Sequence, residues 1–122
     1  MLPSVSDLVA DPAHAGALDG ADRIGGASGG TRLVVRVGLW LSRGSVTRAR
    51  FRSSTCAALI AYAEAACRLL EGGAAPEAVD AARLVRAVRG VHPAQQDRAA
   101  LVSAAVVAAP VARLRPLVTV KG

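Results

Sequence analysis

The chain is poor in cysteine and in aromatic residues, and each of these two shortages excludes a class of protein. Its two cysteines, Cys56 and Cys67, are too few for a small scaffold held by several disulfides. Aromatic residues make up 2% of the sequence, so the stacking platform typical of proteins that bind single-stranded nucleic acid is missing. We therefore expect no nucleic-acid partner, although the formal net charge is +6.

Long hydrophobic runs are also absent. The closest uncharged apolar run, residues 99–109, is shorter than the roughly 20 residues that a membrane-spanning helix needs. Residues 1–7 lack the basic and apolar regions of a signal peptide, so we expect no membrane association and a cytoplasmic location. Cys56 and Cys67 lie on one predicted helix, about 16 Å apart along its axis, which is too far for a disulfide between them. Reduced thiols fit the cytoplasmic location.

Hydrophobic residues make up 52% of the 122 residues, enough for one folded domain over residues 1–122. Alternation of apolar and polar residues predicts a β-hairpin at about residues 32–52, with a turn at residues 42–45. Its second strand places three arginines on one face, which we interpret as a solvated surface, with docking of an acidic partner as the alternative. These arginines are Arg48, Arg50 and Arg52.

Helices are predicted on both sides of this hairpin. A short helix over residues 4–10 is followed by an extended, glycine-rich lead over residues 11–31. After the hairpin, helices are expected at residues 57–70, 76–88 and 94–108. The last helix is expected to bury Leu101, Ala104, Ala105 and Ala108 and to end or kink at Pro110. The order predicts an α+β fold, in which helices pack on one face of a small antiparallel sheet.

Cys56 is the candidate functional residue. It lies where the hairpin passes into a helix, and the positive end of a helix dipole favours the thiolate form of a thiol placed there. The thiolate is the form that attacks sulfur and binds metal. The alternative is a small buried apolar residue, the commoner role of a lone cysteine.

Three segments together resemble the NifU/IscU-type iron–sulfur cluster scaffold domain. The run Pro12-Ala13-His14-Ala15-Gly16 is similar to an N-terminal turn of that family, with His14 in the place of an asparagine. The run Ala49-Arg50-Phe51, followed by Thr55-Cys56, matches a strand and the cysteine that opens a helix. Residues 93–98 lie where the family's last long helix begins. The resemblance implies an IscU-like fold and a role in cluster assembly.

The chain departs from the family at the ligands. The family holds its metal with three cysteines, aided by an aspartate and a histidine. By the resemblance, the first cysteine position falls on Gly29 or Ser28, and the aspartate position falls near Thr31. The histidine position falls on Asp97 and the third cysteine position on Arg98, so that Cys56 alone remains. An iron–sulfur cluster usually takes four ligands, and a weak zinc site of Cys56 with Asp97 or His92 is the remaining metal hypothesis.

We therefore expect a scaffold-like protein that has lost most cluster ligands. It would act as a sulfur acceptor through Cys56, or as an adaptor that docks on a cysteine desulfurase or a related scaffold. The alternatives are a structural, protein-binding subunit without chemistry, and a full cluster site completed between subunits of an oligomer. No catalytic constellation is visible, so we expect no enzyme; Glu64, Glu71, Glu77, Asp80 and Asp97 are interpreted as surface charges.

Overall fold

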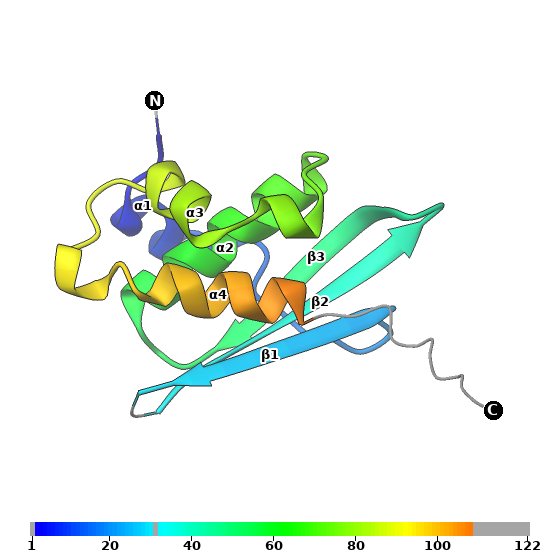
Figure 1. Ribbon diagram of the computed structural model, residues 1–122, viewed down its shortest axis with the longest axis horizontal. Coiled ribbons are helices and arrows are strands. Elements are labelled where there is room, and N and C mark those ends of the chain that lie inside the picture. The colour runs from blue at the N-terminus through cyan, green and yellow to red at the C-terminus, as the bar shows by residue number, and fades with distance from the viewer. Residues whose placement is uncertain (1, 31, 109–122) are drawn as a thin grey trace.

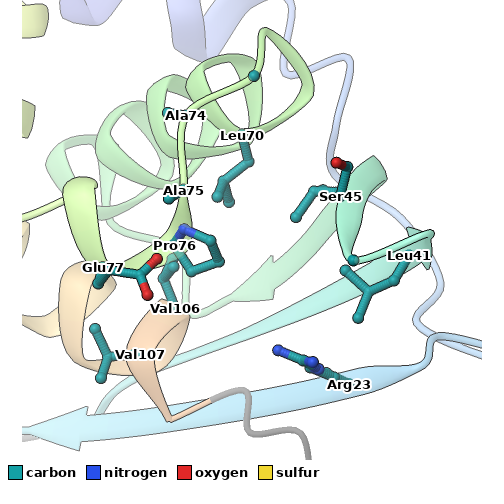
Figure 2. Close-up of a pocket in the computed structure, with 13 residues that line it drawn as sticks. Arg23, Leu41, Ser45, Leu70, Ala74, Ala75, Pro76, Glu77, Val106 and Val107 are labelled. Carbon is teal, nitrogen blue, oxygen red and sulfur yellow. The ribbon is translucent and has the colours of Figure 1, made fainter.

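The structure is a computed structural model that describes residues 2–30 and 32–108. A three-stranded antiparallel sheet forms one layer, in the order β1-β2-β3. The strands are β1 (Arg23–Gly29), β2 (Leu33–Ser42) and β3 (Ser45–Ser53). Figure 1 shows the helices gathered on one side of this sheet, which confirms the predicted α+β class.

The β2–β3 hairpin follows the sequence prediction. Val35, Val37 and Leu39 all point into the core and are fully buried. At the turn, Arg43 and Gly44 have φ values of 54° and 82°, and positive φ at both central residues is typical of the turns that suit the twist of a hairpin.

Strand β1 was missed in the prediction, which read residues 11–31 as an extended lead. Residues 23–29 pair along β2, from Arg23 opposite Leu39 to Gly29 opposite Leu33. The segment contains three glycines, which have low strand propensity and hide the alternation that would reveal a strand. Hydrogen bonds to β2 and contact with a helix supply the stability that the local sequence lacks.

Four α-helices and two short 3₁₀ turns complete the described part of the chain. Helix α1 (Val5–Ala10) begins with a capping box, in which Ser4 and Asp7 bond each other's backbone amides. Helix α2 (Ala57–Glu71) ends at Gly72 and is followed by Gly73, whose φ is 111°. The remaining elements are η1 (Pro76–Ala78), α3 (Ala81–Ala87), η2 (Pro93–Gln95) and α4 (Arg98–Val107).

The two predicted C-terminal helices are shorter than expected. The helix predicted over residues 76–88 is divided, because the Asp80 side chain accepts from the Arg83 amide and so begins a new helix. The helix predicted over residues 94–108 begins at Arg98, after η2. Its buried residues are Ala99, Val102, Ala105 and Val106, so the predicted stripe is wrong except at Ala105. The predicted stop at Pro110 lies outside the described residues.

Helices α2 and α4 cover the sheet and enclose the core. Phe51, Leu59 and Leu70 are buried there together with Val35 and Val37. Leu33, Leu69 and Leu101 are partly buried against this core. Across residues 2–30 and 32–108, no helix is both long enough and apolar enough to cross a membrane.

The opposite face of the sheet is partly covered by the lead between α1 and β1. Leu18 is 5% exposed, and its side chain lies over Gly38 of β2, where a Cβ atom would meet Leu18 Cδ2 at 3.1 Å. The lead also bonds the free edge of β3, since Phe51 donates to the His14 carbonyl and Gly16 donates to the Phe51 carbonyl. The edge strand is thereby protected from pairing with another chain.

Candidate functional site

Cys56 lies at the N-terminus of α2, as the sequence predicted. It is the N-cap residue of the helix, with extended backbone angles, and its carbonyl accepts from the Ile60 amide. The thiol forms no capping bond with the first turn, so it is not used to hold the helix. Cys56 is half-buried.

The side chain of Arg98, the first residue of α4, meets Cys56. The pKa of Arg98 is raised, first by its hydrogen bond to Asp97 and second by a hydrogen bond with Cys56. Arg98 Nη1 donates to Asp97 Oδ1 at 2.6 Å. Arg98 Nε is buried and has no hydrogen-bond partner among the described residues. A cationic group with one unused N–H is therefore held beside the thiol.

A hollow of about 300 Å³ opens beside Arg98, and Cys56 is not among the residues that line it. It is lined by Gly29 and Gly30 from the end of β1, Leu33 from β2, and Asp97, Arg98 and Leu101 from α4. Gly29 lies close against α4, because a Cβ atom there would approach Leu101 Cδ1 to 3.1 Å. Thus Gly29, Asp97 and Arg98, singled out from the resemblance, do meet at one place in the fold. Thr31 lies outside the described residues.

The residues suggested for a zinc site are placed differently. His92 is exposed on η2, where its Nδ1 accepts from the Ala94 amide at 3.0 Å, and it does not line the hollow. The Asp97 side chain is 72% exposed and paired with Arg98. Within residues 2–30 and 32–108, no three His, Cys, Asp or Glu side chains gather as metal ligands would.

Cys67 is a different kind of thiol. It is fully buried in α2, and burial raises its pKa, with the nearby Glu64 and Glu71 carboxylates acting in the same direction. A thiol that remains protonated and inaccessible is a poor nucleophile. Of the two cysteines, Cys56 is the more exposed.

A second polar cluster, which the sequence did not reveal, joins the lead to α2. Glu64 was interpreted as a surface charge, and this is wrong, because its side chain is 0% exposed. Its Oε2 lies 2.6 Å from His14 Nδ1 and 2.8 Å from Arg68 Nε, and its Oε1 accepts from the His14 amide. A buried carboxylate requires such partners.

Glu71 extends the same cluster; it lies at the surface, as predicted, but its carboxylate is engaged within the molecule. Its Oε1 lies 2.8 Å from His14 Nε2, and its Oε2 accepts from Arg50 and from the Ala49 amide. Burial would raise the pKa of Glu71, but the bonds from Ala49, His14 and Arg50 outweigh burial and lower it. Both ring nitrogens of His14 thus contact a carboxylate oxygen, one from Glu64 and one from Glu71.

Comparison with known proteins identifies the domain. A family model described as "NifU-like N terminal domain" matches residues 2–115. The chain belongs to this family. The membership confirms the resemblance inferred from the sequence, and it supports a scaffold-like role in iron–sulfur cluster assembly, in which protein partners generally take part.

A comparison with solved structures adds the fold alone. The solved structure titled "Crystal structure of a hypothetical protein at 2.3 A resolution" is 20% identical, with a TM-score of 0.51, over 88% of this chain and 84% of that chain. Among curated proteins, no match was found.

Proposed function

We propose that this chain is a cluster-assembly scaffold-like protein that has lost most cluster ligands and accepts sulfur through Cys56. The observation that carries the proposal is the pairing of Cys56 with Arg98. The guanidinium is a hydrogen-bond donor beside the sulfur, and by the resemblance it stands where the family would place a cysteine ligand. The proposal places this chemistry in the cytoplasm, where both free thiols remain reduced.

The donors at the hollow argue against a bound iron–sulfur cluster. Cys56 offers one thiolate, whereas a cluster usually takes four ligands. Asp97 is paired with Arg98, and the cation itself disfavours an iron ion at the same point. The glycines at the end of β1 offer no side-chain donor. The same donors would make a zinc site weak, even if His92 moved toward Cys56.

Sulfur transfer requires one accessible thiolate. The Cys56 sulfur would attack the outer sulfur of a cysteine persulfide carried by a partner such as a cysteine desulfurase. A new S–S bond forms at Cys56, the S–S bond in the donor breaks, and the donor cysteine leaves as a thiolate. The reaction needs no external oxidant or reductant. The unused N–H of Arg98 would donate to the terminal sulfur of the new persulfide.

The alternative function is a binding-only subunit, in which Cys56 is structural. Full burial of Cys56 would favour that alternative. The half-buried thiol beside a guanidinium instead favours chemistry at sulfur.

The test measures sulfur delivery directly. The purified protein is incubated anaerobically with a cysteine desulfurase and cysteine, and persulfide is located by mass spectrometry of the digested protein. We expect added sulfur at Cys56, its loss in Cys56→Ser, and its retention in the matched variant Cys67→Ser. Arg98→Gln should lower the rate of transfer while leaving the fold intact.

Two results would contradict the proposal. If Cys56 is modified only after the protein unfolds, the thiol is structural and the binding-only function is correct. If anaerobic reconstitution gives near-stoichiometric iron and sulfide, and the cluster is lost in Cys56→Ser, the chain retains a complete cluster site and the proposed loss of ligands is wrong.

A further inference from the structure

The outer face of the sheet, on the side away from α2 and α4, carries a row of arginines. Strands β2 and β3 place these side chains opposite the buried residues Val35, Val37 and Phe51. The row consists of Arg36 on β2 and of Arg48, Arg50 and Arg52 on β3.

Two of these arginines are engaged within the molecule. The Arg48 guanidinium lies over the Trp40 ring, 4.8 Å from its centroid. Arg50 Nη1 donates to Glu71 Oε2 at 2.8 Å and to the Ala49 carbonyl at 2.7 Å. These contacts explain their positions without any external partner.

Arg36 and Arg52 differ from the other two. They are direct partners across the β2–β3 pairing, and both are exposed. Neither forms a hydrogen bond or an ion pair with any residue in the described part of the chain. Like charges directly opposite one another destabilise a sheet, and no ion pair within the described residues offsets the repulsion between these two.

A hollow of about 360 Å³ is lined in part by Arg36 and Arg52. Its other lining residues come from the lead, at positions 17–20, and from Ile24 of β1. Asp19 is the one acidic residue in this lining, and it forms no ion pair with either arginine within the described structure. Ile24 is 40% exposed and Val34, two residues before Arg36, is 45% exposed. Arginine beside exposed aliphatic side chains is typical of protein-binding surfaces.

We propose that Arg36 and Arg52, with Ile24 and Val34, form a docking surface for an acidic protein segment. Two adjacent guanidinium groups match carboxylates in charge and in bidentate geometry. The aliphatic neighbours accept apolar side chains placed between those carboxylates. A single-stranded nucleic acid fits less well, because the ring of Trp40 on β2 is covered by Arg48.

The surface lies near the end of the sheet that leads to Cys56. Arg52 is the second-last residue of β3, and the chain then passes through residues 54–55 to Cys56. The arginine pair and Cys56 are thus close in the sequence, although the arginines face away from α2. Binding at this surface can be measured without any sulfur transfer, so a failure of the docking proposal is distinguishable from a failure of the proposed function.

The experiment compares two double variants that each remove two exposed arginines. Arg36→Gln/Arg52→Gln removes the proposed site, and the matched control Arg43→Gln/Arg86→Gln removes two arginines elsewhere. The probe is a fluorescein-labelled peptide in which Asp-Glu pairs alternate with leucine, and binding is read by fluorescence anisotropy. A labelled oligothymidylate serves as the nucleic-acid probe. Circular dichroism and thermal melts establish that each variant is folded.

We expect the site variant to weaken peptide binding by about tenfold and the control to change it by less than about twofold. The site variant should also melt no lower than wild type, because a like-charge pair has been removed. Equal losses in both variants would show that net charge alone attracts the peptide, and would overturn the proposal. The proposal would also be overturned if the wild-type protein showed no detectable binding of the peptide. It would likewise be overturned if the protein bound oligothymidylate more tightly than the peptide and the site variant lost that binding.

Discussion

Replacing His14 with alanine tests whether the cluster around Glu64 stabilises the fold. The substitution removes the ring bond to the fully buried Glu64 and the ring bond to Glu71, which is 28% exposed. Hydrogen bonds to charged groups contribute about 1.5–3 kcal/mol each, and a buried charge that loses a partner is destabilising. Glu64 keeps Arg68 and the residue-14 amide. We therefore expect a loss of about 3 kcal/mol in the free energy of unfolding.

Urea unfolding followed by circular dichroism at neutral pH measures this loss. With an m-value of about 1.5 kcal/mol/M, the midpoint should fall by about 2 M urea. The matched control is His92→Ala, which removes an exposed histidine and should change stability by less than about 1 kcal/mol. In a Glu64→Gln background, His14→Ala should be milder, because no buried charge loses its partner.

The reasoning fails if His14→Ala costs no more than the His92 control. It also fails if the effects of His14→Ala and Glu64→Gln are additive, since a shared ion pair requires coupling between the two positions. In either case, the contacts of His14 would be a consequence of the fold with no net contribution to its stability.

Two further perturbations test other parts of the fold. Phe51 of β3 is 2% exposed. Phe51→Ala should therefore lower the free energy of unfolding by about 3–5 kcal/mol. A loss below about 1 kcal/mol in a urea titration would contradict the strand register. Folding lowers the pKa of the Glu71 carboxyl from its ordinary value of 4.5. The stability that Glu71 contributes is therefore present above pH 4.5, and it is lost as the pH falls through the lower pKa of the folded state. Glu71→Gln should therefore flatten the acid limb of a stability–pH profile, and an unchanged limb would show that other carboxylates govern it.

Local signals in the sequence determined a large part of this structure. The alternation of Val35, Val37 and Leu39 fixed which face of β2 is buried, because neighbouring side chains of a strand point to opposite faces. The turn at Arg43 and Gly44, and the cap at Ser4, depend on residues only a few positions apart. For the same reason, the position of Cys56 at the start of α2 was predictable.

Only the tertiary structure decided which distant residues meet. His14 and Glu64 are fifty residues apart, and nothing near either residue indicates that Glu64 is buried. Strand β1 exists because β2 offers it hydrogen bonds, and α4 is rotated from its predicted face because Ala99, Val102 and Val106 fit the core better. The contact of Arg98 with Cys56 likewise depends on how α4 packs beside α2. Charge pairs and helix rotation are set by packing between segments, which local periodicity and propensity do not encode.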